Sequence, residues 1–186
     1  MLLLSSIIVF TGTFASWQLK PMTKEYFLWF TLLSAGVYGF FISTDLFTMF
    51  MFYEVALIPM YLLIGVWGSG QKEYAAMKLT LMLMGGSAFL LIGILGIFYG
   101  AGGDTMNILE IAQRHIPTEM QRLFFPLIFL GFGVLGALFP FHTWSPDGHA
   151  SAPTAVSMLH AGVLMKLGGY GCMHSMHRLT ISLPAM

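Results

Sequence analysis

Long apolar stretches separated by short polar connections are the main pattern of this sequence. A helix needs about 20 apolar residues to cross the hydrocarbon core of a membrane, and several such stretches joined by short loops are typical of a polytopic bundle. The pattern predicts an all-α fold in one transmembrane domain over residues 1–186, with about six spans. These spans are expected near 1–18, 26–43, 46–67, 74–99, 122–142 and 152–174.

Residues 100–121 form the long polar connection of the chain. Within it, Ile108, Leu109, Ile111 and Ala112 recur at helical spacing between polar residues, which predicts a short helix at the membrane interface that Pro117 ends. A different connection, around Pro146–Gly148, has the composition of a turn.

Two prolines lie inside or at the end of predicted spans and indicate irregular helices. Pro59 has no N–H for the carbonyl of Val55. Pro140 follows three glycines within nine residues of the fifth span, and such a segment predicts a kinked or broken helix, which membranes tolerate only against protein or a water-lined cavity. We therefore expect helix breaks at Pro59 and Pro140, the latter within a span that is irregular from Gly131 onward.

Composition strengthens the membrane prediction and excludes other classes. The chain is 57% hydrophobic and only 9% charged, whereas soluble domains are about a quarter charged. Acidic and basic residues balance without a run of like charge, so the expected partners are the lipid bilayer and other membrane subunits, and not nucleic acid. The single cysteine, Cys172, leaves no disulfide and no Cys cluster for zinc or iron–sulfur, so no metal or cofactor site is expected in this chain.

The distribution of basic residues predicts an orientation. The first, third and fifth connections would share one face, with Lys20, Lys24, Lys72 and the nearby Lys78. The opposite face carries Arg114, Arg122 and Arg178. This weak excess of positive charge places the first face in the cytoplasm.

Glu54 is a carboxylate in the middle of the third span, DLFTMFMFYEVALIPMYLLIGVWG. An ionised group at mid-membrane costs roughly 3 kcal/mol or more on insertion scales, so it normally faces protein or water and is often functional. Glu54 is therefore a candidate for an ion path. The alternative is a protonated side chain that serves only helix packing.

Lys166 and His160 are the ionisable residues at membrane depth in the sixth span. Lys166 lies far from either helix end, so it is expected to need an internal partner. Lys78, near the start of the fourth span, has two interpretations: its amine reaches the interface by snorkelling, or it approaches Glu54. We place all four residues on a candidate proton path.

His142 and His149 flank the connection between the fifth and sixth spans. Histidine changes charge near neutral pH, so these two residues are candidates for the cytoplasmic mouth of the path. As an alternative, they belong only to a turn and a helix cap, and spacing does not separate the two interpretations.

Three runs, DLFTMFMFYEVALIPMYLLIGVWG, EYAAMKLTLMLMGGS and PFHTWSPDGHASAPTAVSMLHAGVLMKLGGYG, occur in this order over most of the chain. They resemble subunit M of the proton-pumping NADH:quinone oxidoreductase, respiratory complex I. The same antiporter-like fold occurs in multisubunit sodium/proton antiporters and membrane-bound hydrogenases. The resemblance implies a fragment that covers the third to the eighth of fourteen helices.

The resemblance also implies roles for particular residues. In the family a glutamate pairs with a lysine on a broken helix, and a second lysine continues the path. Glu54 matches the glutamate and Lys166 the second lysine. The position of the first lysine, five residues before Pro140, holds Leu135 here, and Ala137 replaces a proline expected two residues later. Both departures put the usual proton-transfer pair in question.

The resemblance implies a non-redox membrane-arm subunit that couples quinone reduction to proton movement. NADH, flavin, iron–sulfur clusters and quinone would then bind to partner subunits, which include neighbouring antiporter-like subunits, and the chain would lie in a bacterial inner membrane. The alternatives are a subunit of a sodium/proton antiporter or a membrane-bound hydrogenase, or a structural subunit that conducts nothing.

Overall fold

The computed structural model of the chain describes residues 1–19, 23–114 and 116–180, and only the backbone at residues 118 and 175–180. All named elements in these residues are helical, which confirms the all-α fold class. They are α1 (Leu2–Ala15), α2 (Thr23–Ile42), α3 (Leu46–Trp67), α4 (Lys72–Gly100), α5 (Ile108–Gln113), α6 (Thr118–Leu135), the 3₁₀ turn η1 (Phe141–Thr143), α7 (Trp144–Ser151), α8 (Thr154–Leu159), the π-helical turn η2 (His160–Leu164) and α9 (Met165–Thr180).

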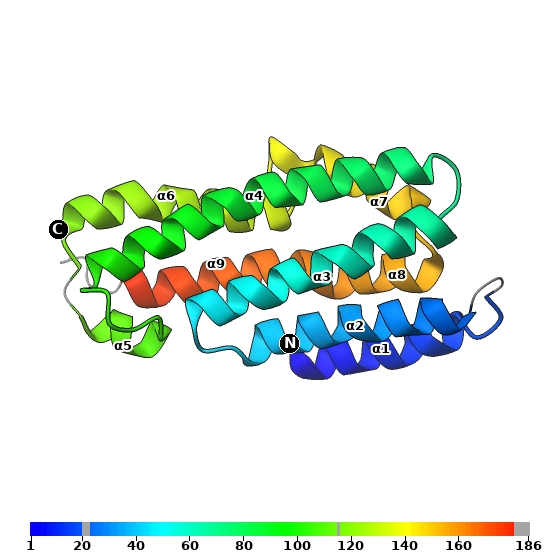
Figure 1. The fold of residues 1–186 in the computed structure, drawn as a ribbon, viewed down its shortest axis with the longest axis horizontal. Helices are drawn as coiled ribbons and strands as arrows, with labels where there is room; N and C mark the ends of the chain where they lie inside the picture. Colours follow the sequence, from blue (N-terminus) through cyan, green and yellow to red (C-terminus); the bar gives the residue numbers. More distant parts are fainter. Residues whose placement is uncertain (20–22, 115, 181–186) are drawn as a thin grey trace.

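The long helices run up and down side by side in one bundle (Figure 1). Helix α2 packs on α3, α3 on α4, α4 on α6 and α6 on α9, while α1 packs mainly on α8. The connections after α1, α3 and α7 lie at one end of the bundle, and those after α2 and α4 lie at the other (Figure 1). This arrangement has the alternation that the predicted spans require.

Three of the described helices, α2, α3 and α4, are long and apolar enough to cross a membrane. Helix α1 is apolar but has only 14 residues. The last two expected spans are interrupted: a break separates α6 from α7, and the π-helical turn η2 lies between α8 and α9. Each of these two segments is therefore divided into shorter helices, and none of these is among the three long apolar helices.

Glycines bring α4 and α6 close together. A Cβ atom added to Gly86 would lie 2.8 Å from the Cβ atom of Val134, and one on Gly93 would lie 2.5 Å from Cγ1 of Ile128. Small residues at such positions let two backbones approach, which is the main source of helix association in lipid. In the run of small residues Gly85, Gly86 and Ser87, Gly86 makes this contact, whereas Gly85 faces open space.

The break in the fifth predicted span begins after Leu135, where α6 ends, so the irregularity expected from Gly131 onward is wrong for residues 131–135. Pro140 lies within it, directly before η1. Ala137 has φ of 54°, a left-handed conformation that is uncommon for a residue with a Cβ atom. The chain then becomes helical again in α7, so the predicted turn at Pro146–Gly148 is wrong. The apolar segment stops near 142, but the helical path continues beside α4 as far as Ser151.

Helix α3 continues through Pro59, so the helix break expected there is wrong. A proline inside a helix removes one backbone hydrogen bond. Pro59 and its neighbour Met60 are buried in the bundle, and packing of both halves of α3 against α2 and α4 keeps the helix continuous.

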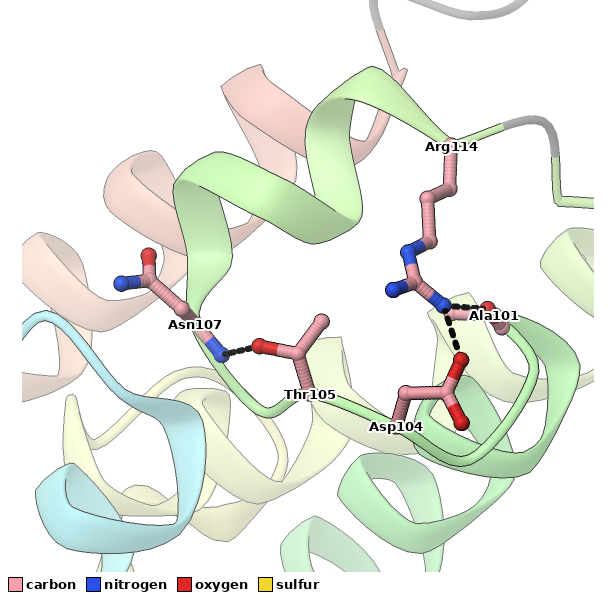
Figure 2. A network of polar contacts seen from close by, with 5 residues as sticks. All are labelled: Ala101, Asp104, Thr105, Asn107 and Arg114. Carbon is pink, nitrogen blue, oxygen red and sulfur yellow. Dashed lines mark hydrogen bonds and ion pairs between the residues drawn. The ribbon is translucent and has the colours of Figure 1, made fainter.

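A polar network shapes the end of the bundle at which α4 gives way to α5 (Figure 2). One guanidinium nitrogen of Arg114 donates to the carbonyl oxygen of Ala101 at 2.9 Å and lies 3.0 Å from a carboxylate oxygen of Asp104. Asn107 caps α5 by accepting a hydrogen bond from the backbone N–H of Leu109 at 3.0 Å. Helix α5 ends at Gln113, before the predicted stop at Pro117. Arg114 follows it and closes the loop through its contacts with Ala101 and Asp104.

Candidate functional site

Glu54 lies in the middle of α3, near the contact with α4. Its neighbour Tyr53 is buried and donates a hydrogen bond to the carbonyl oxygen of Leu83 at 2.9 Å, which ties α3 to α4 at this level. The Glu54 side chain is half-buried, and its Oε1 atom is enclosed without a hydrogen-bond partner among the described residues. A buried polar atom without a partner is unfavourable unless water or an ion satisfies it.

His160 is the most enclosed ionisable side chain of the predicted path, with 1% of its surface exposed. It opens the π-helical turn η2, and such turns occur often at functional sites. Its ring stacks on His149 of α7 with 4.3 Å between centroids and lies 5.3 Å from the ring of Trp144. Its Nδ1 atom has no partner among the described residues.

His149 joins α7 to α8. Its Nδ1 atom lies 3.1 Å from the hydroxyl oxygen of Ser157, so one of these groups donates a hydrogen bond to the other. Trp144, at the start of the same short helix, donates from its indole nitrogen to the carbonyl oxygen of Val134 at 3.2 Å. The cluster of Trp144, His149, Ser157 and His160 therefore links both sides of the break to the last helical segment.

Lys78 does not pair with Glu54. Its amine lies 2.6 Å from a carboxylate oxygen of Asp147, and it stands 5.7 Å from the centre of the Tyr74 ring. Of the side-chain surfaces, 26% of Lys78 and 42% of Asp147 remain exposed. The expected approach of Lys78 to Glu54 is thus wrong, because α7 runs beside α4 and brings a carboxylate from the supposed turn within reach.

Lys166 lies on the outer side of α9, where its side chain is exposed. It lines a groove of about 910 Å³ between α6 and α9, together with Phe129, Gly136, Leu138 and Tyr170. The internal partner expected for Lys166 is not present among the described residues. His160 and Lys166 therefore face different surroundings, one enclosed and one open.

His142 and His149 lie on different elements, η1 and α7. His149 lies two residues before Ser151, the last residue of α7, whereas His142 lies in η1 within the break, with its ring centre 5.7 Å from that of Phe139. The role of His142 and His149 at the mouth of a path stays a prediction. Leu135, at the position of the family's central lysine, is 2% exposed at the last residue of α6.

The structure thus joins Lys78 to Asp147 and His160 to His149, and leaves Glu54 and Lys166 without a charged partner among the described residues. Sequence reasoning missed Asp147, Trp144 and Ser157. The run from Thr143 to Ser151 is polar and contains Pro146 and Gly148, so its composition hid a helix. The four-residue spacing of Asp147 and Ser151 fits one helical face, but an eight-residue segment is too short for this spacing to distinguish a helix from a turn.

A family model described as "NADH:quinone oxidoreductase/Mrp antiporter, TM" matches residues 43–186. NAD(P)H-quinone oxidoreductase chain 4 1 of Synechococcus sp. (strain JA-3-3Ab) is 37% identical over 171 residues, which cover 92% of this chain and 32% of the relative. The chain therefore spans about a third of the length of such relatives.

Chains of solved respiratory membrane complexes share the fold of this chain. The respiratory complex I of Thermus thermophilus with bound NADH contains a chain that matches with a TM-score of 0.86 and 24% identity, over 97% of this chain and 38% of that one. At this identity the match shows the fold alone. A chain of the membrane-bound sulfane sulfur reductase, an archaeal respiratory membrane complex, matches with a TM-score of 0.81 and 28% identity, over 91% and 35%. Because the family model matches residues 43–186, which are most of the chain, this chain belongs to the transmembrane NADH:quinone oxidoreductase/Mrp antiporter family.

Proposed function

We propose that this chain forms part of a proton-translocating, non-redox membrane subunit of a proton-pumping NADH:quinone oxidoreductase. Family membership supports the proposal at the level of the subunit. The observation that carries it is Oε1 of Glu54, a carboxylate oxygen enclosed without a partner among the described residues in an apolar helix. A carboxylate oxygen in this setting is unfavourable unless water or a partner group satisfies it, which is what a water-filled ion path would provide.

In this proposal Glu54, His160 and Lys166 are the proton-binding groups at membrane depth. The start of α4 and the end of α7 lie at the end of the bundle that holds the α3–α4 connection (Figure 1). Lys78 is near the start of α4, and His149 is near the end of α7. Protons would pass between these groups through bound water, because a relay needs proton-binding groups that water molecules can bridge. Nothing in this path needs a redox cofactor in the chain itself.

The remaining parts of the proposal concern the assembly. NADH, flavin, iron–sulfur clusters and quinone would bind to partner subunits, and neighbouring antiporter-like subunits would contact this one in the membrane arm. The bacterial relatives support a bacterial plasma membrane as the location. The first, third and fifth connections would face the cytoplasm.

The proposal predicts that Glu54→Gln lowers quinone-dependent proton transport in membrane vesicles severalfold or more while the complex still assembles, since shape is retained and the proton-binding group is lost. The matched control is Glu110→Gln, which removes an exposed carboxylate from α5 and should leave transport unchanged. Normal transport by Glu54→Gln in a fully assembled complex would contradict the proposed role and favour the packing interpretation.

Leu135 supports a second candidate function, a structural subunit that conducts nothing. This residue is buried and cannot bind a proton, although the resemblance places a lysine at its position. Proton transport that is unaffected by loss of Glu54, His160 and Lys166 together would favour this candidate. A sodium/proton antiporter would instead show transport that depends on sodium without added quinone.

A further inference from the structure

Helix α7 has only eight residues, Trp144–Ser151. An isolated helix of this length is unstable in water, because nucleation is unfavourable and few hydrogen bonds follow it. The break before it removes continuity with α6. Contacts with other helices must therefore determine where α7 lies.

Four contacts hold α7 in place. At its start, Trp144 bonds back to Val134 of α6. At its end, the backbone N–H of Ser69 donates to the carbonyl oxygen of Ser151 at 2.8 Å. Between them, Gly148 stands close to Leu79 of α4, where an added Cβ atom would lie 2.8 Å from a methyl carbon of that leucine. The Lys78–Asp147 ion pair lies on the same side, toward α4.

The other side of α7 carries His149, which stacks on His160 and bonds to Ser157. Asp147 and His149 are two residues apart, so they point to opposite sides of the short helix. Any rotation or retreat of α7 from α4 would move His149 relative to His160, since a helix of two turns moves as one body.

We propose that Asp147 is a positioning residue whose ion pair with Lys78 holds α7 against α4 and thereby keeps His149 stacked on His160. The pair is suited to this task, because it joins the interrupted span to a long continuous helix. It also borders a cavity of about 270 Å³ at the end of the bundle, lined by Ser69, Tyr74, Asp147 and Ser151. The carboxylate is therefore reached from outside, whereas His160, the more deeply placed member of the histidine pair, is buried.

The position of α7 can be measured directly. Ser69 and Ser151 line the same cavity and share a backbone hydrogen bond, so Ser69→Cys with Ser151→Cys creates a disulfide reporter of contact between α7 and the α3–α4 connection. The intact complex would carry this pair in a Cys172→Ser background, since Cys172 is the single native cysteine. The rate of oxidation by a mild oxidant is the readout.

We expect Asp147→Asn and Lys78→Met each to slow formation of the disulfide by about fivefold, the order expected for a partly exposed ion pair. The exchanged pair, Lys78→Asp with Asp147→Lys, should restore the rate, because it rebuilds the attraction with reversed signs. Asp104→Asn is the matched control, since it breaks the exposed Arg114–Asp104 ion pair at the opposite end of the bundle.

Unchanged oxidation rates in both single variants would overturn the proposal, and so would slow oxidation that the exchanged pair fails to restore. Proton transport is measured on the same vesicles, and this second arm rests on the proposed function. Slow oxidation with normal transport would support the positioning role and contradict a function for the histidine pair in conduction. The two proposals therefore fail in distinguishable ways.

Discussion

Glu54 and Lys78 show how location decides the chemistry of an ionisable side chain. Lys78 stands near the start of α4, where part of its surface remains exposed and Asp147 neutralises its charge. Glu54 stands in the middle of α3 with an oxygen that lacks a partner among the described residues. A charge in an apolar helix is unfavourable without such a partner or water. Glu54 is therefore a position at which bound water or a partner group is expected.

Leu135→Lys tests the departure from the family pattern. If the introduced amine acts with Glu54, proton transport should rise severalfold, since an opposite charge favours the ionised carboxylate. Leu135→Met is the matched control, because it keeps the position apolar at similar volume. The gain should vanish when Glu54→Gln is combined with Leu135→Lys. A gain that persists in the double variant would exclude the pairing.

Lys166 and His160 are expected to differ in their effects on transport. Lys166→Ala should abolish coupled proton transport, and His160→Ala should slow it and alter its pH dependence, because both remove a group that binds protons at membrane depth. Transport by vesicles across a pH series is the measurement. Lys24→Ala, an exposed residue of α2, should have no effect. Transport that survives loss of both residues would contradict conduction through the last span.

At the break after α6, the backbone of α9 lies directly against the backbone of the interrupted segment. Gly136 begins the break after α6, and Gly168 of α9 packs on it so closely that an added Cβ atom would meet the Gly136 nitrogen and lie 2.6 Å from the carbonyl oxygen of Phe132. Backbone atoms cannot move aside as a flexible side chain can. The position of α9 against the break therefore depends on the absence of a side chain at residue 168.

Gly168→Ala is expected to lower the free energy of unfolding by about 1–3 kcal/mol, the usual cost of overpacking. Gly169→Ala is the matched control, since an added Cβ atom there would meet nothing within 4 Å. Unfolding of the purified protein in mixed micelles provides the measurement. Equal stability of the two variants would show that α9 moves away from the break without penalty.

For the molecule as a whole, the two ends of the bundle are the basis for its orientation. Gln71, beside the α3–α4 connection, and Gln113, at the end of α5, are both exposed and lie at opposite ends (Figure 1). In a Cys172→Ser background, a membrane-impermeant maleimide applied to whole cells should label Gln113→Cys and not Gln71→Cys, because the lysine-rich face is expected in the cytoplasm. The opposite labelling would reverse the predicted topology.

The sequence by itself determined the fold class and the main helices, because the cost of exposing backbone groups to lipid leaves long apolar stretches only helical solutions. It also singled out Glu54, His160 and Lys166, since ionisable residues are conspicuous in apolar runs. The three continuous helices α2, α3 and α4 lie close to their predicted ranges.

Only the tertiary structure decided which of these residues meet. Helix α7 is too short and too polar for a local pattern to indicate it. Packing on α4 and hydrogen bonds to Val134 of α6 and Ser157 of α8 stabilise it. Its position gives Lys78 the partner Asp147 and brings His149 to His160. Pro59 differs from Pro140 for a related reason. Packing of α3 on both neighbouring helices offsets the loss of one hydrogen bond at Pro59, whereas the segment before Pro140 also contains glycines, which have a low helix propensity. Pairing across helices depends on where segments distant in sequence come to lie, which local spacing does not specify.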